Sequence, residues 1–514
     1  MKNLKSLLLL LLILSLFTAA SASAKDYFVS TDGVDAEERD GRTKNTAWAS
    51  LAYACDRVEA GDHAIHILPG EYVATRTAYP KNGVAIVGRK PHGKDVTRII
   101  ASKQWDLPEL QDYKDDKGRS EYLIAAVARQ PSGEWVPPRD LTINSLQLCS
   151  DPAHRITGAV YIRDGTNVVL KHLNVHDFRW NGLRVEHSEN VLIEHCRVTD
   201  ASTQRLPNRE GGLIRTRWIK HSRLHHNRLI ARDTTGYGYK GGGHRDVRFD
   251  HNFVDTEYFA FESPFEHELG VEIDHNYLTR CISIPKYYQK DPEEEGYDYS
   301  FRIHHNYLTD SYTIEGPRGY LQFDHNRVHV EKTGGRIYTH HGAKSRGPIR
   351  IHHNVVENVD RNFVWMNKGL VENLFVFNNT IFCADAGTRS GTLLSSWTAE
   401  RLNNWVCKNN IVVSAWSQPR RVHGTKRGVP EKITAKSNLF INFTDVPEGN
   451  FTGADPGLAR KGEKPAPFYL PESAESFVVD RGVDVGLPFE GKAPDLGAFE
   501  FGGKPWKLKG IPQP

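Results

Sequence analysis

Short runs of alternating apolar and polar residues recur along the chain. In VEIDHNYL, Val271 and Ile273 alternate with acidic residues, and related runs read SRLHHNRL, VRFDHNFV, FRIHHNYL, LQFDHNRV and IRIHHNVV. Alternation with a period of two is typical of a β-strand with one buried face, and no window of these repeats has helical spacing. The pattern predicts many short strands, each followed by a turn that contains histidine and asparagine.

The asparagine of this motif returns at nearly regular intervals. Successive copies are separated by 25, 24, 30, 20, 28, 25, 31 and 28 residues. A repeat of about 26 residues indicates a solenoid, in which each turn buries its apolar face against its neighbours. Because this period leaves no room for a helix, we expect an all-β chain wound as a single-stranded parallel β-helix of about twelve turns. The copies are Asn227, Asn252, Asn276, Asn306, Asn326, Asn354, Asn379, Asn410 and Asn438, and weaker copies put Cys196, Leu173 and Leu146 in this position.

The repeated triplet of Asp or His, then His, then Asn is compatible with a metal site or with a structural turn. Asparagine tolerates left-handed backbone geometry, and its carboxamide can hydrogen-bond to the same group one turn above and below. We therefore expect an internal asparagine ladder, with the preceding histidines in a second column on the outer surface and no dedicated metal site. These histidines are His226, His251, His275, His305, His325 and His353.

Both ends of a solenoid need a cover, because open sheet edges pair with other strands. From Trp48 to Val58 the apolar residues have helical spacing, and Gly61 follows as a stop, so a short N-terminal capping helix is predicted. The Gly- and Pro-rich C-terminal segment is expected to cover the other end. We divide the chain into a signal peptide at 1–24, an N-terminal capping region with the first strands at 25–134, the β-helix at 135–445 and a closing segment at 446–514.

Residues 1–24 have the plan of a secretory signal peptide. Lys2 and Lys5 precede an apolar run over 7–17, and Ala22, Ser23 and Ala24 follow it. No other apolar run approaches the roughly 20 residues that a membrane span needs. We expect a secreted or periplasmic protein without a membrane span.

Charge and cysteine content exclude several classes of protein. The chain has 66 Lys and Arg against 63 Asp and Glu, and loss of the two signal-peptide lysines leaves 64 basic residues. This balance gives no electrostatic reason to expect nucleic acid as a partner. Six scattered cysteines are too few for a disulfide-stapled fold or a CxxC metal site, so most should be buried singly, with Cys383 and Cys407 as a candidate pair.

Two terminal segments resemble a known family. The run YFVSTDGVD…DGRTKNTAWASLAYACDRVEAGDHAIHILPGEY and the run DPGLA…VVDRGVDVG…APDLGAFEFG resemble the first and last modules of secreted right-handed parallel β-helix proteins of the pectin lyase-like superfamily. The resemblance covers nearly the whole mature chain. It implies a right-handed coil and a substrate groove along the first strand of each turn, whereas the reaction stays open because the superfamily includes lyases, hydrolases, epimerases and adhesins.

Alternation within those groove strands predicts which side chains face the substrate. If Val160, Ile162 and their equivalents on later turns point inward, the residues between them line the groove. The predicted column is Arg163, Glu186, Arg215 or Arg217, Lys240, Glu262, Pro285, Glu315, His340 and Asn367. The residues expected to bind substrate are Glu186, Arg215, Arg217, Tyr237, Tyr239, Arg318 and Asn367.

The predicted column contains an acid pair suited to glycoside hydrolysis. Glu262 and Glu315 lie two turns apart, which is about 9 to 10 Å and near the upper end of the carboxyl separation in inverting glycosidases. Lys240, one turn from Glu262, would keep that carboxyl ionised or hold an anionic group of the substrate. His340 would lie next to Glu315. We expect these four residues to be catalytic, with the acid and the base unassigned.

β-Elimination is the alternative chemistry. A lyase needs a base near the proton on the carbon beside a uronate carboxylate, and a cation that neutralises this carboxylate. Lys240 in GYGYKGGGHRDVRFDHN resembles the lysine of alginate-lyase-like β-helix enzymes, with Arg215 or Arg217 as the cation. The acidic residues that hold calcium in those enzymes are replaced by Tyr237 and Tyr239, so no cofactor is predicted.

Taken together, these patterns predict a polysaccharide-cleaving enzyme, with hydrolysis of an acidic or sulfated glycan as the first hypothesis. A uronate lyase is the second hypothesis, and a non-catalytic glycan-binding or surface β-helix is the third. We expect a monomer whose partner is a polysaccharide or an oligosaccharide.

Overall fold

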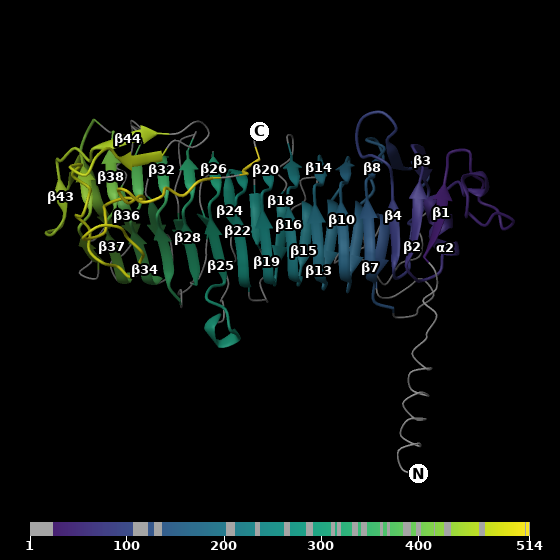
Figure 1. Ribbon diagram of the computed structural model, residues 1–514, viewed down its shortest axis with the longest axis horizontal. Helices are drawn as coiled ribbons and strands as arrows, with labels where there is room; N and C mark the ends of the chain where they lie inside the picture. The colour runs from purple at the N-terminus through teal and green to yellow at the C-terminus, as the bar shows by residue number, and fades with distance from the viewer. Residues whose placement is uncertain are drawn as a thin grey trace, which may run out of the picture.

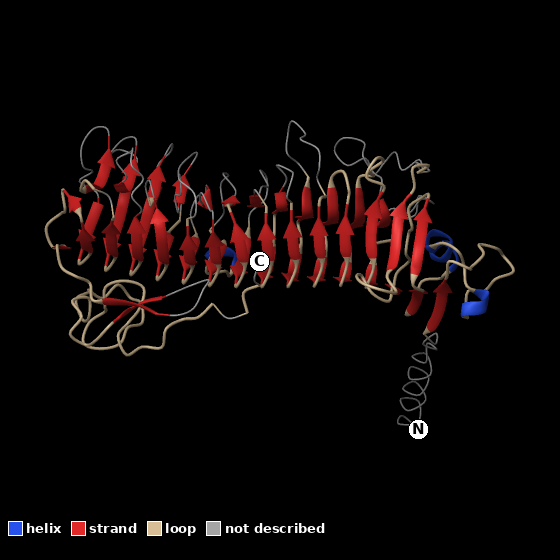
Figure 2. Cartoon of the chain, turned by 90° about the horizontal axis from the view of Figure 1, so that it is seen from above, coloured by secondary structure: helices blue, strands red, loops and turns tan. Residues whose placement is uncertain are grey.

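The chain winds into a long parallel coil with three faces, and each turn adds one strand to each face (Figures 1 and 2). The three long sheets, called A, B and C, contain 15, 15 and 13 strands, which confirms the predicted all-β parallel β-helix and differs slightly from the predicted twelve turns. The computed structural model describes residues 24–105, 122–127, 136–201, 211–231, 237–256, 258–261, 268–283, 291–309, 314–315, 320–330, 338–340, 347–359, 363–366, 371–383, 392–396, 402–415, 417–425, 433–461, 468–508 and 510–512. Nearly all of the predicted signal peptide lies outside these residues.

The strands of each sheet follow one another turn by turn. Sheet A consists of β1 (Lys25–Val29), β2 (His63–Ile67), β4 (Val84–Val87), β7 (Arg139–Asn144), β10 (Thr166–Lys171), β13 (Glu189–Glu194), β16 (Lys220–His225), β19 (Arg245–Asp250), β22 (Leu269–Asp274), β25 (Phe301–His304), β28 (Leu321–Asp324), β31 (Ile349–His352), β34 (Val371–Phe377), β37 (Leu402–Lys408) and β40 (Ile433–Lys436). Sheet B consists of β3 (Gly70–Ala74), β5 (Thr97–Ala101), β8 (Gln147–Ser150), β11 (Asn174–His176), β14 (Arg197–Thr199), β17 (Arg228–Ile230), β20 (Phe253–Asp255), β23 (Tyr277–Thr279), β26 (Tyr307–Thr309), β29 (Arg327–His329), β32 (Val355–Val359), β35 (Thr380–Cys383), β38 (Ile411–Ser414), β41 (Leu439–Ile441) and β43 (Phe451–Thr452). Sheet C consists of β6 (Tyr122–Val127), β9 (Gly158–Arg163), β12 (Asn181–Glu186), β15 (Gly212–Arg217), β18 (Tyr237–Gly242), β21 (Tyr258–Phe261), β24 (Cys281–Ser283), β27 (Ile314–Glu315), β30 (Tyr338–His340), β33 (Val364–Met366), β36 (Thr392–Ser396), β39 (Arg420–Thr425) and β42 (Phe443–Thr444).

Helical structure in the described residues is limited to the 3-10 turns η1 (Lys44–Thr46) and η3 (Glu293–Glu295) and the helix α2 (Leu51–Arg57). The α2 helix is the predicted capping helix. The Ser50 hydroxyl accepts a hydrogen bond from the Tyr53 backbone N–H at 3.2 Å, and Leu51 and Cys55 are buried in the core of the coil. Within the described part of the chain, no helix has the length and apolar content of a membrane span.

The predicted asparagine ladder is present and buried. The Asn276 Oδ1 atom accepts from both the backbone N–H and the side-chain amide of Asn252, at 2.8 and 3.0 Å. The Asn276 amide donates to the Phe249 carbonyl at 2.9 Å and to Asn306 Oδ1 at 3.0 Å. Each carboxamide therefore hydrogen-bonds to backbone groups at the corner between sheets A and B. The Asn252 backbone N–H lies outside the strands and has no partner in the hydrogen-bond ladders of the sheets. The same pattern runs from Asn227 to Asn450.

The left-handed residue at this corner is the histidine, not the asparagine. His251 and His275 have φ values of 54° and 53°. This geometry turns the imidazole outward, as predicted, and stacks it on the imidazole of the next turn. Ring centroids of consecutive turns lie 4.9 to 5.2 Å apart. The stack, called the histidine column, comprises His172, His195, His226, His251, His275, His305, His325 and His353.

The closing segment packs along the flank of the coil rather than only over its end. Its antiparallel pair β44 (Leu458–Lys461) and β45 (Phe468–Pro471) is followed by a chain that returns over sheet B toward the middle of the molecule (Figures 1 and 2). Leu496 packs with Ile411 and Leu439, and Ile511 packs with Phe253 and Tyr277. Residues distant in sequence thus cover the outer face of sheet B at strands such as β20, β23, β38 and β41.

Five cysteines, namely Cys55, Cys149, Cys196, Cys383 and Cys407, are buried free thiols. Cys383 and Cys407 are therefore not bridged, in contrast to the candidate pairing. Burial raises the pKa of the Cys383 thiol to about 11. These thiols act as small apolar core groups.

Replacing Asn276 by alanine should lower the free energy of unfolding by about 3 kcal/mol, because the buried backbone N–H of Asn252 loses its acceptor. Denaturant unfolding measures the change. The matched control is Asn403→Ala at an exposed position of β37, which should unfold like the parent chain. Equal effects of the two substitutions would contradict a stabilising ladder.

The histidine column should make stability depend on pH. Burial, followed by the charges of neighbouring histidines, lowers the pKa of His305 from 6.5 to about 3. Between these values the unfolded chain binds a proton at His305 that the folded chain does not, so this contribution is full above pH 6.5 and is lost as pH falls toward 3. We expect the melting temperature to fall over this range.

The variant His305→Asn should flatten this pH dependence, and Asn378, at φ 48° in the same position of its turn, shows that asparagine adopts the required backbone conformation. The exposed His154 provides the control variant His154→Asn. If both variants keep the parent slope of melting temperature against pH, the column is not the source of the dependence.

Candidate functional site

Charged side chains form two rows on the outer side of sheet C. Val160, Leu183, Ile214 and Tyr239 belong to the core, so the next residue on each strand faces outward. The strand register aligns Tyr161, Arg184, Arg215 and Lys240 in an inner row, and Arg163, Glu186, Arg217 and Gly242 in an outer row. We call these two rows, over β9, β12, β15 and β18, the cationic rows.

The cationic rows hold five basic residues and one carboxylate. Arg184, Arg215 and Lys240 are only 3, 2 and 7% exposed, and Glu186 is 3% exposed. Neighbouring strands of a sheet lie about 4.8 Å apart, so like charges stand side by side in a poorly hydrated environment. Such a row of basic side chains raises the local positive potential and attracts anionic groups.

The pKa shifts follow this crowding. Burial, and then the charges of Arg184 and Arg217, lower the pKa of Arg215 to about 10. Burial by itself would raise the pKa of Glu186, but the charges of the surrounding arginines hold it below its usual value. Glu186 accepts from the Arg184 Nε at 3.0 Å and from the Tyr161 hydroxyl at 3.2 Å. Glu186 is therefore an ionised counter-charge that positions Arg184.

Lys240 lies at the end of the inner row. Its ammonium nitrogen is 4.6 Å from the centre of the Tyr237 ring, and Tyr237 in turn packs against Tyr258 at 5.3 Å. Tyr237, predicted to bind substrate, is thus placed beneath the Lys240 ammonium and is largely buried. On one side Lys240 pairs in register with Arg215, and on the other it pairs with Ala260.

The register corrects the predicted column. Lys240 and Glu262 are not register partners, because Ala260 pairs with Lys240. Ala260 pairs with Ser283, and Ser283 pairs with Glu315, so Glu315 shares the row of Lys240 three turns away; the predicted Pro285 lies outside the described residues. Glu315 pairs with Thr339 rather than with His340. Of the four predicted catalytic residues, Lys240 and Glu315 are thus aligned by strand pairing, whereas His340 is not the partner of Glu315.

Several predicted site residues cannot be placed further. Glu262, Arg318 and Asn367 lie outside the described residues. The side chains of Glu315 and His340 also lie outside them, although their backbones form part of β27 and β30. Their catalytic roles stay predictions.

Tyr239 is inside the coil and cannot contact substrate, contrary to prediction. Its hydroxyl lies 2.5 Å from the Thr216 hydroxyl and 2.9 Å from His244 Nε2. His244 Nδ1 lies 3.0 Å from one carboxylate oxygen of Glu268. The two oxygens of this carboxylate accept hydrogen bonds from the backbone N–H groups of Gly243 and His244. This fully buried network holds the turn that ends β18, one residue beyond the outer row.

Sequence reasoning overlooked Arg184 and Tyr161. Arg184 lies between two inward residues, Leu183 and Val185, so the same alternation that selected Glu186 also places Arg184 outward. The guanidinium carbon of Arg184 lies 4.8 Å from the centre of the Tyr161 ring. The outward position between the two inward residues of each strand was the available signal.

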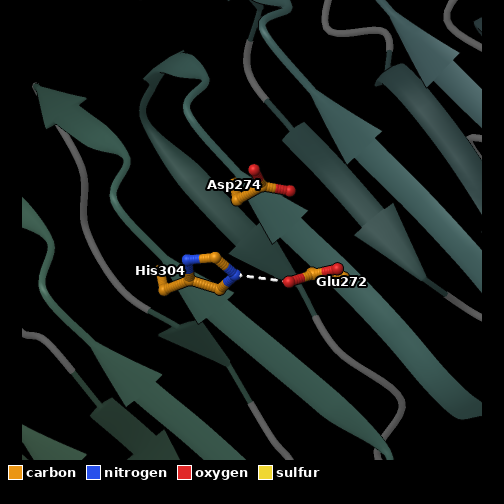
Figure 3. A group of neighbouring side chains, drawn as sticks. All are labelled: Glu272, Asp274 and His304. Atoms are coloured by element: carbon orange, nitrogen blue, oxygen red, sulfur yellow. Dashed lines mark hydrogen bonds and ion pairs between the residues drawn. The ribbon is translucent and has the colours of Figure 1, made fainter. Parts of the chain in front are cut away.

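A possible metal-ligand set occurs on sheet A rather than on sheet C. Glu272, Asp274 and His304 offer ligand atoms within 4.8 Å of one another (Figure 3). His304 Nε2 is 2.7 Å from a Glu272 oxygen, and both Asp274 oxygens accept from Arg248, at 2.8 and 2.7 Å. Because Arg248 already supplies the positive charge, these atoms form an ion network that needs no metal.

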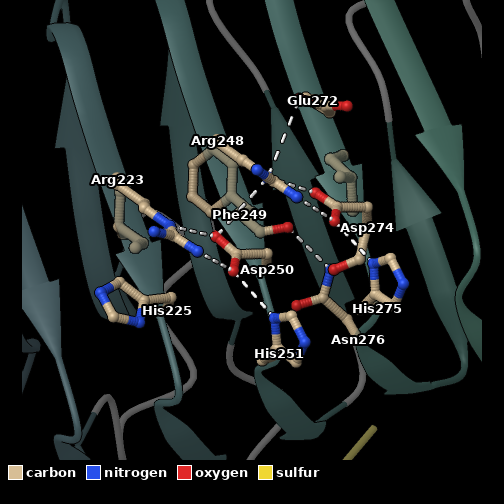
Figure 4. A network of polar contacts seen from close by, with 12 residues as sticks. Arg223, His225, Arg248, Phe249, Asp250, His251, Glu272, Asp274, His275 and Asn276 are labelled. Carbon is tan, nitrogen blue, oxygen red and sulfur yellow. Dashed lines mark hydrogen bonds and ion pairs between the residues drawn. The ribbon is translucent and has the colours of Figure 1, made fainter. Parts of the chain in front are cut away.

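The same ion network repeats from turn to turn (Figure 4). Arg223 donates two hydrogen bonds to Asp250, at 2.7 and 2.6 Å, just as Arg248 donates to Asp274. His251 Nδ1 lies 2.8 Å from Asp250. Each aspartate thus joins an arginine on the preceding strand to the adjacent ring of the histidine column, which fixes the orientation of that ring.

Comparison with known proteins shows the fold and leaves the activity open. No protein-family profile and no curated protein sequence matches the chain. A mutant tailspike protein of E. coli bacteriophage HK620, solved in complex with a pentasaccharide, has a TM-score of 0.51 at 10% identity, over 80% of this chain and 76% of that one.

Two further solved structures match part of the chain. Gene product 12 of bacteriophage phi29 has a TM-score of 0.51 at 11% identity, over 74% of this chain and 52% of that one. The GH87 α-1,3-glucanase unit of Streptomyces thermodiastaticus has a TM-score of 0.42 at 11% identity, over 78% of this chain and 64% of that one. The chain thus spans less than two thirds of both proteins. The likenesses to the tailspike and to gene product 12 show the fold and nothing about the reaction.

Proposed function

We propose that the protein is an exported enzyme that acts on an anionic polysaccharide bound across the cationic rows. The supporting observation is the side-by-side placement of Arg184, Arg215 and Lys240, buried and in register on adjacent turns. Guanidinium and ammonium groups aligned in this way can bind the carboxylate or sulfate groups of a glycan through charge-assisted hydrogen bonds. The HK620 tailspike, a β-helix of the same fold type, was solved with a bound oligosaccharide.

β-Elimination on a uronate is the reaction that the described residues favour. Arg215 would neutralise the uronate carboxylate, and Lys240, once its ammonium group has given up a proton to solvent, would take the proton from the adjacent carbon. The bond from the ring to the glycosidic oxygen then breaks, a carbon–carbon double bond forms, and the proton on Lys240 passes to the leaving oxygen. Glu186 would hold Arg184 in place for the neighbouring sugar.

Hydrolysis is the second candidate. It is supported by the position of Glu315, which shares the inner row with Lys240 through Ala260 and Ser283. This reaction requires a second carboxyl group opposite Glu315, for which Glu262 is the candidate. The variants Glu262→Gln and Glu315→Gln should then each abolish cleavage.

The two reactions are distinguished by Lys240→Arg, which keeps the charge but removes the base. Under elimination this variant should bind an acidic glycan within a few-fold of the parent protein and lose about 100-fold or more in turnover. Products are followed by the ultraviolet absorbance of unsaturated uronates together with new reducing ends. Reducing ends without that absorbance would exclude elimination and support the hydrolase.

Binding is tested separately with Arg217→Ala, whose side chain is partly exposed. This variant should weaken binding of a uronate or sulfated glycan, and added salt should weaken the parent protein's binding in the same way. The control Arg197→Ala removes an equal charge from sheet B and should have no effect. Binding that responds equally to both substitutions would place the glycan elsewhere.

A further inference from the structure

A pocket lies between the histidine column and the closing segment. Its volume is about 220 Å³, and its walls include His325, His353, Phe489 and Trp506. At roughly 30 Å³ per water molecule this space holds about seven waters, the size of one small ring rather than of a chain. His325 and His353 come directly after β28 and β31 of sheet A in the sequence. The pocket is therefore separate from the cationic rows, which lie on β9 to β18 of sheet C.

The pocket combines aromatic faces with hydrogen-bonding groups. Phe499 and Trp506 are stacked, with centroids 5.2 Å apart, and the Trp506 ring meets His325 edge-on at 5.7 Å. Among the described residues, the exposed large apolar side chains are two valines and two phenylalanines, and both phenylalanines, Phe489 and Phe501, belong to this segment. Of these two exposed phenylalanines, Phe489 lines the pocket and Phe501 does not.

The charges around the pocket differ in sign from those of the cationic rows. Glu490 and Glu500 line it together with one basic residue, Lys504. Burial, and then the Asp495 and Asp480 charges, raise the pKa of Glu500 to about 7, so near neutral pH its carboxyl group both accepts and donates hydrogen bonds. Burial holds the pKa of His353 well below its usual value, which leaves an uncharged imidazole. Among the described residues that line the pocket, Lys504 is the one basic residue that could pair with an anion.

From these groups we infer that the pocket between His325, His353, Phe489 and Trp506 binds a single uncharged sugar ring, such as the terminal residue of a neutral oligosaccharide. Aromatic faces contact the C–H side of a sugar ring, while carboxyl and imidazole groups exchange hydrogen bonds with its hydroxyls. The choice of a sugar as ligand rests on the proposed function. The pocket would hold a neutral branch or end while the cationic rows hold the anionic chain.

Calorimetry of the full chain with methyl glycosides of neutral hexoses, and with the matching uronic acids, tests this inference. Phe489→Ala and Glu490→Gln should each lower the affinity for the neutral glycoside about tenfold. Phe501→Ala, which removes an equally exposed ring outside the pocket, should leave the affinity within about twofold. Trp506→Phe should remove the change in tryptophan fluorescence that binding produces.

The inference is overturned if no neutral glycoside binds saturably, if the uronic acids bind more tightly than the neutral sugars, or if Phe501→Ala weakens binding as much as Phe489→Ala. Arg217→Ala separates the two proposals. If it leaves neutral-sugar binding intact and no acidic glycan binds the parent protein, the pocket stands and the proposed function falls. If acidic glycans bind and are cleaved while Phe489→Ala changes nothing, the pocket assignment falls alone.

Discussion

The hydrogen bonds of the ladder asparagines hold each corner of the coil to the next. At this corner the chain leaves sheet A in a left-handed conformation at a histidine, so the following backbone N–H points along the axis of the coil and away from any strand partner. The carboxamide of the next turn, as in the contact from Asn252 to Asn276, accepts that N–H and passes the pattern on. Leaving one such buried N–H without an acceptor would remove a large share of the free energy of unfolding of a typical protein domain, because that free energy is small.

One consequence of this repeated corner is strict alignment of equivalent residues. Because each turn is held to the next at the same point, outward residues of sheet C stack in rows, and Arg184, Arg215 and Lys240 come to lie side by side. A free surface would let these long side chains spread apart. The fold instead keeps these positive charges close together, which is an arrangement suited to a polyanionic ligand.

The same alignment produces the histidine column, which in turn gives the closing segment a surface to pack on. The rings are nearly parallel because each left-handed corner aims its imidazole identically, and the Asp250 and Asp274 carboxylates hold the nitrogens. Trp506 then packs edge-on against His305 and His325. The proposed sugar pocket therefore arises from a repeat that is itself structural.

The sequence by itself determined the all-β coil, the capping helix, the asparagine ladder and most inward residues of sheet C, such as Val160 and Leu183, because these features depend on periodicity and on residue type. It did not determine which outward residues share a row. Lys240 follows Asn227 by 13 residues, whereas its partner Ala260 follows Asn252 by only 8, and the register also shifts between Tyr237 and Tyr239. Because the connections between strands differ in length, counting residues from the asparagine does not reveal which outward residues are aligned. Only strand pairing in the folded chain shows that the partner of Lys240 is Ala260. The burial of Tyr239 and the path of the closing segment along sheet B were likewise decided by tertiary packing, since both depend on contacts between residues far apart in the sequence.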